Sequence, residues 1–273
     1  MSRRLRIQRK DGIPLESEIK ELDFIDQIYY INLEHRTDRK EEILQEIKLI
    51  DPELKRTARI NAIKHDYGEI GCGESHILAI KDAIENNHNM ILILEDDFNF
   101  DAKISILEEV YQELIKHDSK FNLFQLSRNL KRGNKISNNL VEIIDSQTLS
   151  GYLIRNNNKS VEEEEISPKE DKIINSLREV SNSQTTSGYL VNNGFFQELI
   201  DNFTEAVEKM KSVLLNKKVS DKEKQKCRET YAIDQHWKKL QGPGKGFYTS
   251  NLRLGYQRPS YSDINKEMSN YLI

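Results

Sequence analysis

MILILEDDFNF, residues 90–100, is the stretch that decides the fold. Its first five residues are all apolar, in a run too short to span a membrane and too rich in isoleucine for an easy helix. Such a run is typical of a strand buried on both faces of a sheet. Glu95, Asp96 and Asp97 follow at once and cannot continue a buried run. The pattern therefore predicts a strand that delivers three carboxylates to the rim of an α/β sheet, where ligands of open sheets bind.

These three carboxylates also suggest a metal site. Because side chains alternate along a strand, Glu95 and Asp97 are expected to point to one side and Asp96 to the other. Carboxylate oxygens suit a hard divalent cation such as Mg²⁺ or Mn²⁺, which completes its coordination with water and substrate phosphates. The alternative is that acidic residues merely end the strand in solvent.

The composition limits the classes of protein. A chain of 273 residues can bury one substantial core, and its charged fraction of 32% against 37% hydrophobic residues is polar but not that of a disordered chain. The net charge of −4 argues against general nucleic-acid binding. Two cysteines leave no disulfide framework to propose, which favours a reducing compartment. Neither a membrane-spanning run nor a secretory signal is recognisable, so a cytoplasmic protein is expected.

Segments of strand and helix character alternate around residues 90–100. Residues 24–33 read as a strand, residues 34–50 as a loop and an amphipathic helix, and residues 56–63 as a short strand. A helix from about Glu74 then leads into the central strand. This order is typical of βαβ units, which form a mostly parallel sheet with helices on both faces.

Two loops before the central strand carry candidate site residues. Asn32, Arg36 and Arg39 lie at the end of the first strand and in the loop after it, where guanidinium groups suit phosphate or carboxylate, although exposed arginines are often plain surface. Three glycines at positions 68 to 73 favour a tight backbone before the helix. Ser75 and His76 are then expected in its first turn, where free amides favour an anion. A lone histidine there is more often a packed structural group.

A tandem duplication follows a predicted helix at residues 104–116 and a predicted strand at 121–127. The cores SQTLSGYL and SQTTSGYL belong to two copies that begin at Asn138 and Asn175, an offset of 37 residues. The second copy runs into a strongly amphipathic helix, whereas the first runs into asparagines and an acidic stretch. We therefore predict that the second copy forms a core strand and that residues 138–174 are a peripheral insertion.

The last part of the chain carries two further candidates. Residues 219–229 read as a charged connector, and a short helix begins around Asp234, which is placed either to cap that helix or to act in catalysis. Trp237, the only tryptophan, is suited to stack on a sugar or to anchor the helix in the core. Residues 244–265 are rich in Gly, Ser, Arg and Tyr and are expected to form an ordered loop over a site.

Four stretches together resemble glycosyltransferase family 25, the family of lipopolysaccharide glycosyltransferases and procollagen galactosyltransferases, which also has members in large DNA viruses. YYINLEHRTDR is similar to the family form INLDRRxDR, with Glu34 and His35 where Asp and Arg are usual. GCGESH matches GCxxSH, LILEDDFNF matches LEDD with a following aromatic residue, and AIDQHW with QRPSYSDI resembles the closing segments. The matches run from Asp26 to Ile264, and the duplication is a departure from the family pattern.

The resemblance implies a GT-A fold, a Rossmann-like α/β sandwich, as a single domain over residues 24–273 after a basic and polar tail at residues 1–23. It implies a UDP-sugar donor, Mn²⁺ or Mg²⁺ as cofactor, and transfer of galactose or glucose, with inversion, to a hydroxyl group of a glycan or of hydroxylysine in a collagen-like protein. If the source is viral, the host cytoplasm is the expected location.

The resemblance also assigns roles to the candidate residues. Asp97 is the expected metal ligand, and Glu95 a second ligand or a ribose contact that Asp96 supports. The nucleotide side is expected to comprise Asn32, Arg36, Arg39 and Ser75. Asp234 is the expected general base, with His76 as the fallback and Trp237 at the acceptor.

Two rival functions stay open. A metal-dependent phosphoryl or nucleotidyl transferase uses similar carboxylates, but neither a P-loop nor a GxGxxG spacing occurs in the chain. A catalytically silent carbohydrate-binding or scaffold protein with the same fold is the alternative from another class.

Overall fold

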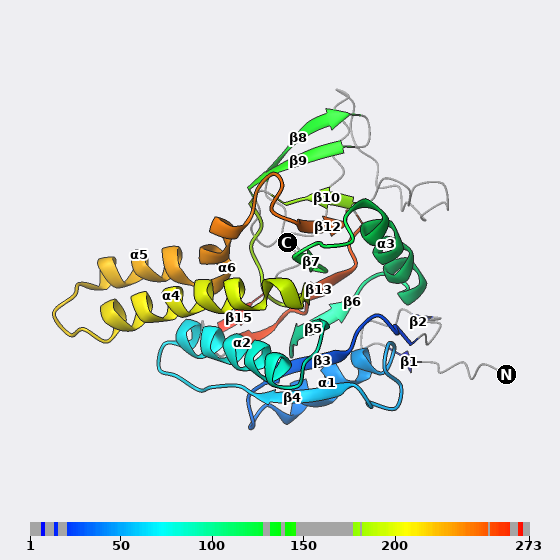
Figure 1. Ribbon diagram of the computed structural model, residues 1–273. Helices are drawn as coiled ribbons and strands as arrows, with labels where there is room; N and C mark the ends of the chain where they lie inside the picture. Colours follow the sequence, from blue (N-terminus) through cyan, green and yellow to red (C-terminus); the bar gives the residue numbers. More distant parts are fainter. Residues whose placement is uncertain are drawn as a thin grey trace, which may run out of the picture.

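The computed structural model describes residues 7–8, 14–15, 21–127, 132–137, 140–145, 177–180, 182–250, 252–262 and 267–269. At its centre is a seven-stranded sheet in the order β4-β3-β5-β11-β7-β12-β10 (Figure 1). Its strands are β3 (Gln27–Asn32), β4 (Thr57–Asn61), β5 (Met90–Glu95), β7 (Leu123–Gln125), β10 (Leu177–Glu179), β11 (Gly188–Asn192) and β12 (Phe247–Ser250). Only β10 and β11 run against the common direction of the other five strands of this sheet. The predicted α/β class with a mostly parallel sheet is confirmed.

Helices cover both faces of the sheet (Figure 1). They are α1 (Thr37–Ile47), α2 (Gly68–Glu85), α3 (Ile104–His117), α4 (Phe196–Leu214), α5 (Asp221–Tyr231) and α6 (Ile233–His236), with the 3₁₀ helices η2 (Asn193–Phe195) and η3 (Trp237–Leu240). One apolar core joins α2 and α4 to the sheet, and a second joins α1 and α3 to its opposite face. The two cores hold the carboxyl ends of the strands in a fixed arrangement.

The strand β5 is buried on both faces, as its unbroken apolar run predicts. Ile91 and Ile93 enter the core beneath α2 and α4, whereas Leu92 and Leu94 enter the core beneath α1 and α3. All four side chains are fully buried, and each contributes about 1.5–3 kcal/mol of apolar burial. This burial fixes the place where the chain leaves the sheet and turns polar.

Short strand pairs lie outside the main sheet. The strand β6 (Phe98–Phe100) pairs antiparallel with β13 (Gly255–Gln257). Two-stranded pairs are also formed by β1 (Ile7–Gln8) with β2 (Pro14–Leu15), by β8 (Arg132–Ser137) with β9 (Leu140–Asp145), and by β14 (Ser260–Ser262) with β15 (Glu267–Ser269). The segment 244–265, expected to be a loop, therefore supplies β12, β13 and β14. Its strand character was hidden because these strands are short and pair with distant segments.

Two sequence-based boundaries are wrong. The helix α2 begins at Gly68 and not near Glu74. Its glycines allow close packing: a Cβ at Gly71 would lie 2.1 Å from the carbonyl oxygen of Ile63. The supposed connector at 219–229 contains α5, which starts with a capping box in which Ser220 and Glu223 bond each other's backbone amides.

The prediction that the second copy of the duplication forms a core strand is confirmed. The second copy supplies β11, which lies between β5 and β7 in the sheet. Of the first copy the structure describes β9, and residues 146–176 lie outside the described residues. Most of the predicted tail at residues 1–23 lies outside them as well, so both assignments stay predictions. None of the helices described has the length and apolar character needed to cross a membrane.

Candidate functional site

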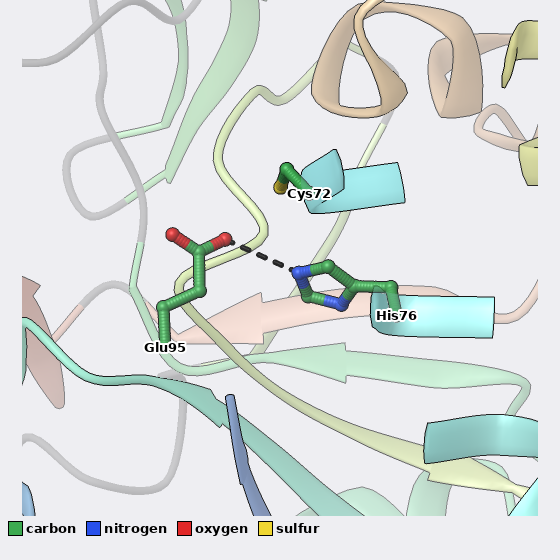
Figure 2. A group of neighbouring side chains, drawn as sticks. All are labelled: Cys72, His76 and Glu95. Atoms are coloured by element: carbon green, nitrogen blue, oxygen red, sulfur yellow. Dashed lines mark hydrogen bonds and ion pairs between the residues drawn. The ribbon is translucent and has the colours of Figure 1, made fainter. Parts of the chain in front are cut away.

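The polar site begins where β5 ends at Glu95. Asp96 and Asp97 form a turn before β6, so the strand does not continue through them. These two residues are called the acidic turn below. The expected alternation is therefore wrong: Asp96 and Asp97 both form ion pairs with Arg39 on α1, at 2.8 Å and 3.6 Å. Glu95 instead faces His76 on α2 (Figure 2).

Asp96 ties three elements together. Its Oδ1 accepts a hydrogen bond from Arg39 at 2.8 Å, and its Oδ2 accepts one from Asn32 Nδ2, also at 2.8 Å. The same Asn32 nitrogen donates to the carbonyl oxygen of Arg36 at 3.0 Å. Burial raises the pKa of Asp96, although the charge of Arg39 opposes this effect. With both oxygens engaged, Asp96 joins β3 and α1 to the end of β5.

Asp97 is a buried carboxylate with an unused oxygen. Its side chain is only 10% exposed, and Oδ1 has no hydrogen-bond partner within the described part of the chain. Burial and the charge of Glu95 raise the pKa of Asp97 to about 7, while Arg39 and Arg258 act in the opposite direction. A buried oxygen of this kind fits a cation that supplies the missing partner.

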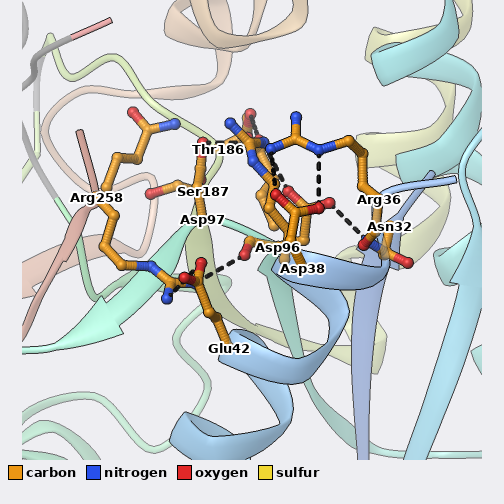
Figure 3. Close-up of polar contacts among 12 residues, drawn as sticks. Asn32, Arg36, Asp38, Glu42, Asp96, Asp97, Thr186, Ser187 and Arg258 are labelled. Atoms are coloured by element: carbon orange, nitrogen blue, oxygen red, sulfur yellow. Dashed lines mark hydrogen bonds and ion pairs between the residues drawn. The ribbon is translucent and has the colours of Figure 1, made fainter. Parts of the chain in front are cut away.

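Arg258 closes the site from the far end of the chain. Its guanidinium group donates to the carbonyl oxygen of Asp96 at 3.0 Å and lies 2.9 Å from the carboxylate of Glu42 on α1 (Figure 3). Its backbone amide donates to the carbonyl oxygen of Asp97 at 2.8 Å. These bonds fix the acidic turn from the side of β13. Sequence reasoning missed Arg258, although it lies inside the QRPSYSDI stretch that carries part of the family resemblance.

Glu95 lies between α2 and the segment before β11. Its Oε1 accepts a hydrogen bond from Thr186 at 2.7 Å and lies 3.3 Å from Nε2 of His76. Burial raises the pKa of Glu95, but the hydrogen bonds from His76 and Thr186 outweigh burial, so the pKa lies below its ordinary value. Glu95 is therefore held as a carboxylate beside Asp97.

The segment at residues 183–187 is buried and polar and is held by side chains. Gln125 Nε2 donates to the carbonyl oxygens of Gln184 at 2.7 Å and of Thr185 at 2.8 Å. The indole of Trp237 donates to the carbonyl oxygen at position 183 at 3.0 Å. Thr185 has a φ of 80°, a left-handed conformation that a β-branched residue adopts only under such constraint. This turn directs Thr186 toward Glu95.

Asp234 lies in the first turn of α6, and the N-cap of that helix is Ala232. Its predicted capping role is therefore wrong. Burial and the charge of Glu95 raise the pKa of Asp234 to about 6, while Lys238 and hydrogen bonds from Gln235 and from the backbone of Thr185 lower it. Because Glu95 is its strongest charged neighbour, Asp234 belongs to the same electrostatic site as the acidic turn.

The model of glycosyltransferase family 25, described as LPS biosynthesis protein, matches residues 64–214, which is more than half of the chain. The matched part contains α2, β5, the acidic turn, β11 and α4. The chain belongs to glycosyltransferase family 25. Membership makes it a glycosyltransferase in general terms, with a sugar donor and an acceptor as substrates.

No curated protein matches the sequence. Among solved structures, the crystal structure of mannose-1-phosphate geranyltransferase from Thermus thermophilus is similar over 85% of this chain and 73% of that one, at 10% identity and a TM-score of 0.35.

Three residues that were predicted for the site of this glycosyltransferase are fully buried. Ser75 lies inside α2, donates to the carbonyl oxygen of Gly71 and accepts from the amide of Ile63, so its expected place in a first helical turn is wrong. His76 is fully buried, and its two ring nitrogens face Tyr189 and Glu95. Trp237 has no exposed surface, so it anchors the core and cannot stack on a sugar.

The two arginines of the first loop differ in their surroundings. Arg36 forms an ion pair with Asp38 at 3.0 Å, and its side chain is 14% exposed. Arg39 is buried against Asp96 and Asp97. The structure thus brings Asn32, Arg36 and Arg39 to the acidic turn, and their contact with a nucleotide stays a prediction.

Proposed function

We propose that this glycosyltransferase moves galactose or glucose from a UDP-sugar to a hydroxyl group, with inversion at the anomeric carbon. The acceptor class is a glycan or a protein hydroxyl such as that of hydroxylysine in a collagen-like chain. The observation that carries the proposal is the buried Asp97 carboxylate, whose Oδ1 has no partner among the described residues, next to the ionised Glu95. Such a pair suits the cation that a nucleotide diphosphate requires.

Asp97 and Glu95 are the residues that would hold Mn²⁺ or Mg²⁺. Their fit to a divalent cation is supported by the unused Oδ1 of Asp97 and by the mutual repulsion of the two carboxylates. When bound, the ion supplies positive charge that stabilises the departing diphosphate.

We assign the nucleotide side to Asn32, Arg36 and Arg39, at the carboxyl end of β3. Asp96 belongs there as a positioning residue, because it holds Asn32 and Arg39 at 2.8 Å each. Arg36 keeps its guanidinium near the surface, where a phosphate can reach it.

Asp234 is the general base in this proposal. A base must be ionised before reaction, and a carboxyl group with a pKa of about 6 is mostly ionised at neutral pH yet still accepts a proton more readily than an ordinary aspartate. It would take the proton of the acceptor hydroxyl as that oxygen attacks the sugar. We prefer Asp234 to His76 as the base, because both ring nitrogens of His76 face protein groups.

The test is release of UDP from a panel of UDP-sugars, with candidate glycan and collagen-peptide acceptors, in Mn²⁺ and in EDTA. We expect release that is selective for one donor, needs the metal and is lost in Asp97→Ala. The matched control is Asp201→Asn, an exposed carboxylate on α4 that should keep full activity.

Two outcomes would contradict the proposal. Absence of release together with absence of UDP binding by calorimetry would favour a silent scaffold with the same fold. Release that is equal in Mn²⁺ and in EDTA would remove the metal from the mechanism.

A further inference from the structure

A second set of metal-binding side chains lies beside the acidic turn. Cys72 and His76 are four residues apart on α2, so they lie on the same side of the helix, and Glu95 faces them from the end of β5 (Figure 2). One ligand atom from each residue lies within 4.8 Å of the other two. The three residues therefore offer a sulfur, a nitrogen and an oxygen atom that could bind a single metal ion.

The geometry of the His76 ring fits metal binding through Nε2. This nitrogen lies 3.3 Å from Oε1 of Glu95, which is about the separation of two ligands that each lie about 2.0–2.1 Å from a tetrahedral Zn²⁺. The other ring nitrogen, Nδ1, lies 2.9 Å from the hydroxyl oxygen of Tyr189. In the metal-free protein Nε2 donates to Glu95. A metal ion that displaces this proton would leave Nδ1 as the donor to Tyr189 and direct the Nε2 lone pair at the metal, the usual arrangement of a ligating histidine.

The local charge favours a cation. Burial and then the charges of Glu95, Asp234, Glu69 and Asp97 raise the pKa of the Cys72 thiol, so its main charged neighbours are all acidic. The side chain of Glu95 is 22% exposed, and Cys72 is half-buried, which leaves a way in for an ion. A divalent cation at this point would offset the repulsion among these carboxylates and would stabilise the thiolate.

We propose that Cys72, His76 and Glu95 form a binding site for a thiophilic divalent ion of the zinc class. Thiolate and imidazole ligands select Zn²⁺ or Co²⁺ over Mg²⁺ and Mn²⁺, which prefer oxygen. The site is thus chemically different from the one at Asp97 and Glu95, and its existence does not depend on the transfer reaction. Because Glu95 belongs to both sets, zinc and manganese compete for this carboxylate.

The test is titration of the metal-free protein with Co²⁺, a coloured substitute for Zn²⁺. A thiolate ligand gives a charge-transfer band in the near ultraviolet, and we expect this band in the wild-type protein and its loss on addition of Zn²⁺. Cys72→Ser should abolish the band and weaken zinc binding at least about tenfold. Cys227→Ser is the matched control, because Cys227 is the only other cysteine of the chain and lies on α5.

Three results would overturn the site. They are binding of Co²⁺ without a thiolate band, a band that persists in Cys72→Ser, and an absence of Co²⁺ and Zn²⁺ binding, which would make His76 and Glu95 a structural pair only. If Cys72→Ser does not fold, X-ray absorption of the zinc-loaded wild-type protein decides, since a zinc shell without sulfur refutes the proposal. None of these readouts uses UDP release, so this site and the proposed transfer reaction fail separately.

Discussion

Asp97 is a buried carboxylate whose ionisation lowers the stability of the metal-free folded protein. Its pKa of about 7 in the folded protein lies above the ordinary value of 3.8, so the folded state binds this proton more tightly than the unfolded state. The resulting stability is present at low pH and is lost as the pH rises from about 4 to about 7. A buried charge of this kind costs the metal-free protein about 1–4 kcal/mol at neutral pH.

Replacing Asp97 by Asn should therefore stabilise the metal-free protein while ending its metal-dependent activity. At pH 8 in EDTA we expect the melting temperature to rise by about 2–4 °C for each kcal/mol, and the gain should vanish near pH 4. Thermal unfolding at both pH values measures this, with Asp201→Asn as the control. A lower melting temperature at pH 8 would mean that Arg39 and Arg258 already compensate the charge.

Asp234 should set the acidic limb of the pH profile. A base with a pKa of about 6 loses its ionised form as the pH falls, so kcat should drop about tenfold for each pH unit below 6. Asp234→Asn should reduce kcat by at least about 10²-fold and remove this limb. The control is Asp221→Asn, a carboxylate in the first turn of α5. An unchanged limb in Asp234→Asn would assign the titration to another group.

At the scale of elements, the segment at residues 183–187 connects the sheet with two acidic groups of the site. Gln125 on β7 donates to two of its carbonyl oxygens, while the segment gives a hydroxyl bond to Glu95 and a backbone bond to Asp234. The left-handed Thr185 shows that the segment is held in place by its surroundings. Gln125 thus holds the segment that contacts Glu95 and Asp234.

Gln125→Leu should remove the amide donor that the buried carbonyl oxygens of Gln184 and Thr185 share, and Gln184 keeps the weaker bond from the Ser183 hydroxyl at 3.3 Å. We expect a cost of about 1–3 kcal/mol. Because Thr186 and the Thr185 amide then lose their fixed positions, kcat should fall and the pKa of the acidic limb should move. Melting temperature and the pH profile of UDP release measure both effects. Gln197→Leu, an exposed glutamine on α4, is the control. A stable variant with wild-type kcat and pH profile would show that the segment is held without Gln125.

Local periodicity predicted elements well wherever the apolar pattern was continuous. The strand β5 was recognised because its apolar run is unbroken, and the helix α4 because its apolar residues repeat with period 3.6. The helix α5 was missed because Cys227 is its only buried residue, although the Ser220–Glu223 capping box was a local signal. The start of α2 was missed because Gly71 serves close packing against Ile63, and Gly73 against Val207 and Ile233, which a sequence does not show.

For the whole molecule, residue type singled out the acidic residues together with their partners Asn32 and Arg39, but not the partners that come from distant segments. Asp97 and Asp234 were singled out because carboxylates at a sheet rim and a helix start suit the chemistry, and their roles stay predictions. Thr186 and Arg258 were not found, since their bonds to Glu95 and Asp96 join residues 91 and 162 positions apart. These contacts form because β11 pairs with β5 and β13 pairs with β6, and these pairings exist only in the folded chain.

The strand order of the main sheet allows a test of the prediction that residues 138–174 are a peripheral insertion. No strand of this sheet, as described, contains residues 138–174. β7 and β10 lie on either side of β12 and run in opposite directions, so the connection between them starts and ends at one edge of the sheet. It has 51 residues, and 14 would remain after removal of 37. Fourteen residues reach about 45 Å, whereas strands two places apart are separated by about 10 Å.

We therefore expect the variant that lacks residues 138–174 to be soluble, to unfold cooperatively and to keep UDP binding. Circular dichroism melts and calorimetry measure this. Removal of residues 175–194 is the matched control: it deletes β10 and β11, takes out the strand between β5 and β7, and should leave an insoluble chain. Aggregation of the first variant would mean that the first copy is part of the folded core and not an insertion on its periphery.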